Sequence, residues 1–255
     1  MRARPILILF FIAFISFPMG AGATRVTLTD VPAYDWYHGC GPTAAAAVLG
    51  YYDLNGYDNL FNASGWDAVR QTSSVADEIA SPGHIDFTLS GGPEPSQDTS
   101  IAEFFGTSED GLAHGWSYFH KAVDAFEGYS AYRGYDDWTA QNYVYGTSFV
   151  WNDLIAEIDA GRPMMFLVDS DGNNSEDHFI TVLGYDNTDT GNPLYGFYNT
   201  WTEDETINWT RFRGIDDESW GVYGATLVTP AVPVPSSILL LGFGLISLTG
   251  LARKK

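Results

Sequence analysis

The chain has very little cysteine: one residue, Cys40, among 255. A single thiol cannot form an intramolecular disulfide, and it cannot supply the paired cysteines of a structural zinc site. The sequence also lacks an HExxH motif, a GxSxG motif and a phosphate-binding loop. We therefore expect no cofactor and no metal site. An exposed odd thiol is a liability in an oxidising compartment unless it is buried or used, which draws attention to Cys40.

The chain also has few basic residues. The chain has 12 of them against 32 acidic residues, for a net charge of −20. Five of the 12 lie at the two ends, at Arg2, Arg4 and 253–255, whereas all 32 acidic residues lie between those ends. Such an acidic middle disfavours binding to nucleic acid or to an anionic membrane surface. An aromatic content of 15% is high for a disordered acidic chain, so we predict a packed domain.

The N-terminus predicts export. Arg2 and Arg4 precede an apolar segment at 6–17, and small residues follow at 21–23. This is the pattern of a signal peptide over residues 1–23. An uncleaved membrane anchor is disfavoured because the apolar segment is short for a spanning helix.

The C-terminus predicts a second targeting signal over residues 232–255. A proline motif at 232–237 precedes an apolar, transmembrane-type helix at about 238–252 and a basic end at 253–255. The arrangement resembles the PEP-CTERM sorting signal of Gram-negative bacteria, with Val234 where that signal has glutamate. The resemblance implies an exosortase-type processing enzyme as partner and a transient inner-membrane anchor. The protein would then reach the cell surface or the extracellular space. Residues 24–231 remain as one domain.

Cys40 lies between Gly39 and Gly41, directly before Pro42 and a run of alanines. This composition predicts a helix that begins at the cysteine and ends near Tyr52. A helix N-terminus lowers the pKa of a thiol, and the two glycines leave room for a substrate backbone to approach. Cys40 therefore has the setting of a nucleophile, although a lone cysteine can also be a small buried core residue.

The first half of the chain is rich in predicted helices and the last third in short apolar strands, which indicates an α+β fold. Further helices are predicted at 66–80, 99–105, 115–126 and 151–160. Extended segments are predicted at 26–29, 143–150, 164–168, 179–184, 194–198 and 224–229.

A cysteine nucleophile needs a base and a group that orients the base. His178 stands at the start of an apolar strand, and Asn199 ends the next strand, so adjacent strands could bring the two together. We expect His38 to have a structural or cleft-lining role. The remaining histidines are expected on surfaces or half-buried helix faces: His84, His114 and His120. The acidic segment 169–177 has its glycine at the fourth position rather than the sixth, which favours a solvated loop over a calcium loop.

Two stretches, 31–53 and 151–201, resemble the papain-like cysteine peptidases of the bacteriocin-leader (double-glycine) type. The matching motifs are Cys-Gly-Pro-Thr from Cys40 and the strand that begins at His178. The resemblance implies a papain-like fold, in which the cysteine begins a central helix packed on a C-terminal antiparallel sheet. It further implies that Cys40 attacks a peptide or protein substrate, that His178 is the base and that Asn199 orients it. Residues 56–150 match nothing in that family.

One departure concerns the oxyanion site. The family has a glutamine six residues before the cysteine, where this chain has Tyr34. The Cys40 N–H still donates, and Tyr34, Trp36 or His38 are candidates for the missing donor. Two other functions remain open: a catalytically silent papain-like domain that binds peptide or extracellular matrix, and an acyl transferase with the same three residues.

Overall fold

The structure is a computed structural model that describes residues 23–231. The predicted signal peptide up to residue 22 and the predicted sorting signal from 232, with its apolar segment 238–252, lie outside the described residues. Within residues 23–231, no helix combines the length and hydrophobicity needed to cross a membrane.

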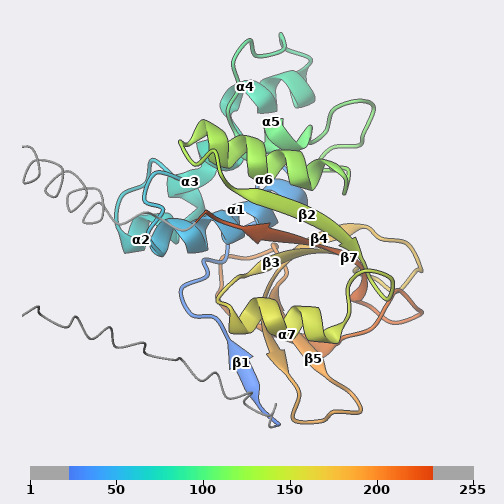
Figure 1. The fold of residues 1–255 in the computed structure, drawn as a ribbon. Coiled ribbons are helices and arrows are strands. Elements are labelled where there is room, and N and C mark those ends of the chain that lie inside the picture. Colours follow the sequence, from blue (N-terminus) through green and yellow to red (C-terminus); the bar gives the residue numbers. More distant parts are fainter. Residues whose placement is uncertain (1–22, 232–255) are drawn as a thin grey trace, which may run out of the picture.

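The front half of the described chain is helical and surrounds α1 (Cys40–Leu54), which lies at the centre of the molecule (Figure 1). The alanine run of α1 is fully buried because small side chains let other elements approach closely. The other helices are α2 (Trp66–Val69), α3 (Thr72–Ile79), α4 (Pro82–Ile85), the π-helical turn η1 (Asp86–Ser90), α5 (Ile101–Phe105), α6 (Lys121–Tyr132) and α7 (Trp151–Asp159).

In the described residues, seven strands form one sheet with the order β2-β7-β3-β4-β5-β6, and β1 pairs with the far end of β4. Every pairing between these strands is antiparallel. The strands are β1 (Arg25–Thr27), β2 (Thr139–Val144), β3 (Met164–Asp169), β4 (His178–Asp186), β5 (Leu194–Tyr198), β6 (Asn208–Arg211) and β7 (Gly221–Thr229).

The sheet is covered on both faces (Figure 1). Successive side chains of a strand point to opposite faces, and β3 divides its residues accordingly. Met165 and Leu167 join the core of α1, α5 and α6, whereas Phe166 packs with Leu154 and Ile158 of α7. This double burial explains why β3 and β4 are apolar throughout. The predicted α+β, papain-like architecture is confirmed, with the cysteine helix packed on an antiparallel sheet.

The buried elements follow the sequence prediction closely, and the exposed ones do not. The helix predicted over 66–80 is two helices, because Gln71 has an extended backbone between α2 and α3. The helix predicted over 115–126 was placed too early, since α6 begins at Lys121. The extended segment predicted at 143–150 was wrong over most of its length: β2 covers Thr139–Val144, so only residues 143 and 144 belong to both. The half-exposed strand β6 was missed.

Candidate active site

Cys40 is the first residue of α1, and its side chain is only 8% exposed. The flanking glycines are required by close packing. A Cβ on Gly39 would lie 2.8 Å from Thr107 Cγ2, and one on Gly41 would lie 2.9 Å from Ser117 Oγ. The expectation that these glycines make room for a substrate is therefore replaced by another reason: they admit the segment 107–117.

The environment of the thiol differs from the expectation of a lowered pKa. Burial raises the pKa of Cys40 to about 11. Main-chain hydrogen bonds from Phe179, Gly41 and Cys40 itself act in the opposite direction but are outweighed. The thiol is therefore neutral at pH 7, because the desolvation of a buried thiolate exceeds the benefit of the helix N-terminus. The contact with Phe179 places the sulfur beside the first residues of β4.

His178 begins β4 and is 5% exposed. Its Nε2 lies 2.8 Å from the main-chain oxygen of Asn199. A carbonyl oxygen can only accept, so Nε2 carries a proton and Nδ1 of the neutral ring holds the lone pair. Burial lowers the pKa of His178, although the Asn199 bond and Asp177 act the other way. The ring is thus neutral at pH 7.

Asn199 meets His178 through its main chain. Its side-chain Oδ1 accepts the N–H of Trp201 at 3.1 Å. The two strands therefore bring His178 and Asn199 together, as the sequence suggested, but the atom that faces the imidazole is a carbonyl oxygen that any residue could supply. The role of Asn199 as an orienting residue stays a prediction.

Thr200 is a residue that sequence reasoning missed. It is 2% exposed, its φ is 59°, and its Oγ1 lies 3.1 Å from His178 Nε2. The same hydroxyl donates to Phe179 O at 3.2 Å, so its oxygen accepts from the Nε2–H. The neighbouring Trp201 lies over the imidazole, with ring centroids 4.7 Å apart. The only signal for Thr200 was its position directly after Asn199.

Cys40 and His178 line one cavity of about 640 Å³. One wall comes from residues 112–120, within the part of the chain that showed no resemblance in sequence. Trp36, Trp116 and Tyr118 line this cleft and are 39%, 49% and 42% exposed. Aromatic rings that remain this exposed offer flat surfaces for ligand contact. Predicted surface residues His114 and His120 also line it.

The three candidates for an oxyanion donor lie at different positions relative to Cys40. The Tyr34 hydroxyl donates to Val69 O and stands against Gly50, 10 residues beyond Cys40. At a rise of 1.5 Å per residue, this is about 15 Å along α1 from the sulfur. His38 contacts Thr88 Oγ1 at 2.9 Å. Of the three, Trp36 is the one that lines the cleft with Cys40.

Two further expectations have clear outcomes. His84 is fully buried, so its expected place on a surface or half-buried helix face was wrong. In the segment 169–177, the Asp169 carboxylate accepts main-chain N–H groups of Gly172, Asn173 and Asn174. These bonds close the loop on itself, which favours the loop interpretation over a calcium site.

A cysteine at the start of a central helix and a histidine on an antiparallel sheet, both lining one cavity, are arranged as in a papain-like cysteine peptidase. The chain belongs to the Peptidase_C39 like family, whose model matches residues 28–226. This match includes both the Cys40 helix and the His178 strand. It also spans residues 56–150, so the expectation that this segment matches nothing in the family was wrong. No curated protein matches the chain closely enough to count as a relative.

Proposed function

We propose that the protein is an exported cysteine peptidase that hydrolyses peptide bonds, with Cys40 as nucleophile and His178 as base. One observation carries the proposal: the Nε2–H of His178 is held by Asn199 O, which leaves the Nδ1 lone pair for the thiol in the shared cleft. Thr200 Oγ1 accepts the same N–H and limits rotation of the ring. Membership of the family supports a cysteine peptidase in general.

The reaction starts from a neutral thiol and a neutral imidazole. As Sγ of Cys40 attacks the scissile carbonyl carbon, its proton passes to Nδ1 of His178. The Cys40 N–H donates to the oxyanion of the tetrahedral intermediate. His178 then gives its proton to the leaving amine, and a thioester remains on Cys40. Water attacks the thioester while His178 accepts a proton from it. The C–S bond then breaks, the carboxylic acid leaves, and His178 returns its proton to Sγ, which restores the thiol.

The cleft also suggests a substrate preference. Glu176 and Asp177 lie at its edge beside His178, and the aromatic residues Trp36 and Trp116 line it. Carboxylates favour a cationic side chain on the substrate, and exposed indoles favour an apolar or cationic one. We infer that peptides with a basic residue near the scissile bond are the preferred substrates.

The proposal includes the route to the outside. Residues 1–23 act as a signal peptide, and residues 232–255 act as a sorting signal that an exosortase-type enzyme processes. The apolar segment 238–252 then serves as a transient inner-membrane anchor before release to the cell surface or beyond. The expectations of no nucleic-acid partner and of a peptide or protein substrate belong to the same proposal.

A silent peptide-binding domain is the second candidate. The buried thiol favours this candidate, because its pKa of about 11 keeps it protonated. The Tyr34 hydroxyl favours it too, since it donates to Val69 O and is not available as an oxyanion donor. Both candidates use the same cleft, so hydrolysis separates them.

The test is hydrolysis of a fluorescence-quenched peptide library by the purified protein and by Cys40→Ala and His178→Ala variants. We expect turnover by the wild type and none by Cys40→Ala at an unchanged melting temperature. Peptide binding to all three proteins without turnover by any would replace the peptidase with the binding domain. Turnover that persists in Cys40→Ala would remove Cys40 as nucleophile.

A further inference from the structure

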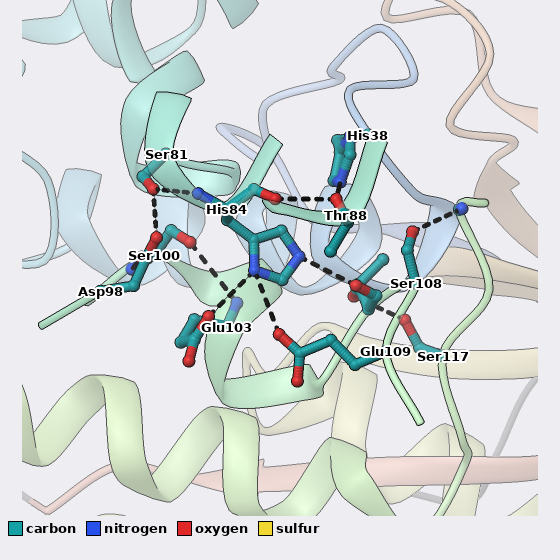
Figure 2. Close-up of polar contacts among 12 residues, drawn as sticks. His38, Ser81, His84, Thr88, Asp98, Ser100, Glu103, Ser108, Glu109 and Ser117 are labelled. Atoms are coloured by element: carbon teal, nitrogen blue, oxygen red, sulfur yellow. Dashed lines mark hydrogen bonds and ion pairs between the residues drawn. The ribbon is translucent and has the colours of Figure 1, made fainter. Parts of the chain in front are cut away.

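A second group of reactive side chains lies apart from the Cys40 and His178 pair. It consists of His84 in α4, Glu103 in α5 and Glu109 in the loop that follows α5, as Figure 2 shows. Imidazole Nδ1 lies 3.0 Å from a Glu103 oxygen and 3.5 Å from a Glu109 oxygen. His84 is fully buried, and both glutamates are about three-quarters buried, with side chains 26% and 24% exposed.

The hydrogen bonds of His84 restrict its chemical state. Its Nε2 lies 2.9 Å from the Thr107 carbonyl oxygen, which can only accept, so Nε2 carries a proton. Its Nδ1 faces two carboxylates, which also only accept when ionised. A neutral ring would therefore direct a lone pair at two anionic oxygens. Three states satisfy these contacts: a second ring proton on Nδ1, as in an imidazolium; a proton on one of the two carboxyl groups; or a cation between the three groups.

The geometry fits a metal ion. Zinc binds histidine nitrogen and carboxylate oxygen at about 2.0–2.2 Å, which separates two tetrahedral ligand atoms by about 3.4 Å. The two contacts of Nδ1, at 3.0 and 3.5 Å, bracket this value, and all three ligand atoms lie within 4.8 Å of one another. A metal-bound histidine usually donates its other N–H to a carbonyl or carboxylate, as His84 does to Thr107.

We propose that His84 Nδ1, Glu103 and Glu109 bind a divalent transition-metal ion of the zinc type. One nitrogen and two carboxylate ligands leave a position for water, and imidazole disfavours Ca²⁺ and Mg²⁺ in this place. No short ligand spacing marks the site, because His84 lies 19 residues from Glu103 in the chain. The expectation of no metal site rested on such spacings and could not have found it.

A second cavity lies beside one of the three proposed ligands. Glu109 lines a hollow of about 340 Å³ together with Glu94 and Asp110. Glu94, Glu109 and Asp110 make the lining of this hollow acidic. An acidic hollow of this kind attracts cations and holds the water that would complete the coordination.

The ion would stabilise one wall of the catalytic cleft. Thr107, which accepts from His84, contacts Ser117 Oγ through its hydroxyl at 2.7 Å. Its methyl group would lie 2.8 Å from a Cβ on Gly39, too close for a side chain there. Binding at His84 thus joins α4, α5 and the segment 107–117 to the residue that precedes Cys40. We assign the ion a structural role there, independent of whether the protein is a peptidase.

The test measures zinc binding directly. The full chain is purified, stripped with a chelator and dialysed against Zn²⁺, and its metal content is measured by mass spectrometry. We expect one zinc per chain and a rise in melting temperature with zinc concentration, since binding to the folded state stabilises it. His84 is fully buried, so its replacement tests folding as much as binding.

The informative variants are therefore Glu103→Gln and Glu109→Gln, which keep shape and remove a charged ligand. Each should weaken zinc binding by about tenfold or more. Replacing even a residue that only hydrogen-bonds to a metal ligand typically lowers metal affinity by about 10- to 100-fold. The matched control is Glu94→Gln, which lies in the same hollow but outside the three ligands and should bind as the wild type does.

A second measurement separates the three states of His84. Nitrogen NMR of the imidazole should show a protonated Nε2 and a zinc-shifted, unprotonated Nδ1. Ring nitrogens that do not respond to zinc would overturn the proposal: two protonated nitrogens would assign an imidazolium held by two glutamates, and an unprotonated Nδ1 would assign a bond from a protonated glutamate. Equal zinc content in the wild type, Glu109→Gln and Glu94→Gln would overturn it as well, because the metal would then bind elsewhere.

Discussion

Thr181 Oγ1 donates a hydrogen bond to the Ala44 carbonyl oxygen at 3.1 Å, and this bond joins β4 to the first turn of α1. Ala44 lies four residues after Cys40, and Thr181 lies three residues after His178. Both groups are fully buried. A polar side chain that crosses between the two elements fixes their register more narrowly than apolar packing does. It therefore sets the place of the thiol relative to the imidazole.

We predict that Thr181→Val lowers kcat/KM for peptide hydrolysis by about tenfold, because a small displacement of the nucleophile is costly. The loss of one neutral hydrogen bond should lower the free energy of unfolding by only about 1 kcal/mol. The matched control is Thr226→Val, which removes another buried hydroxyl, 2.7 Å from Asn142 Oδ1 on β2. Equal activity losses in both variants would contradict a positioning role for Thr181.

The contact of His178 with a main-chain oxygen leads to a prediction about Asn199. Asn199→Ala keeps that carbonyl, so we expect kcat to stay within about threefold of the wild type. Thr200→Val removes the hydroxyl that accepts the same N–H, and we expect a larger decrease, of about tenfold. Steady-state kinetics on one peptide measures both. A loss of several orders of magnitude in Asn199→Ala would instead assign the orienting role to its amide.

The sequence was sufficient for the elements that are buried on both faces. The alanine run after Cys40 and the apolar strand after His178 carry strong local patterns, and the structure has both within two residues of the predicted bounds. Chain order and a resemblance in these two segments also led to the correct fold class.

The sequence could not predict properties of the site that depend on tertiary contacts. The pKa of Cys40 depends on how deeply α1 is covered by the segment 107–117, which no local pattern reports. Whether Asn199 uses its side chain or its main chain depends on the turn that it forms with Trp201. The His84 group joins residues that are distant in sequence, so only the folded chain brings them together.

The place of Tyr34 leads to a prediction about the oxyanion site. Its hydroxyl is bonded to Val69 O, remote from Cys40, so Tyr34→Phe should leave kcat unchanged. The same variant should lower the free energy of unfolding by about 1–3 kcal/mol, because a buried carbonyl loses its donor. Thermal unfolding and peptide hydrolysis of the same preparation give both values.

Trp36→Phe is the matched aromatic variant within the cleft. It keeps an aromatic ring and removes the indole N–H, and we expect kcat to fall by about a hundredfold if that N–H replaces the missing glutamine. A decrease in Tyr34→Phe alone, with Trp36→Phe unaffected, would reverse the assignment of these two residues.

The buried state of Cys40 predicts how the thiol responds to pH. A pKa of about 11 means that iodoacetamide alkylation should be slow at pH 7 and should accelerate continuously up to pH 10. Peptide hydrolysis should behave differently, because it needs only a neutral His178. The lowered pKa of that imidazole places the acidic limb of the kcat/KM profile below pH 6.5, the usual value for histidine. A plateau of the alkylation rate below pH 8 would show a stabilised thiolate instead.

The raised pKa of Cys40 also affects the stability of the fold at alkaline pH. The unfolded thiol loses its proton near pH 8.5, whereas the folded thiol keeps it to about pH 11. Between these values the unfolded state binds fewer protons than the folded state, so the free energy of unfolding falls as the pH rises. Each pH unit in this window costs about 1.4 kcal/mol. Cys40→Ala lacks the titrating group, so its unfolding free energy should fall less steeply from pH 9 to 10.5 in denaturant titrations. Parallel curves for the two proteins would mean that Cys40 titrates alike in the folded and unfolded states.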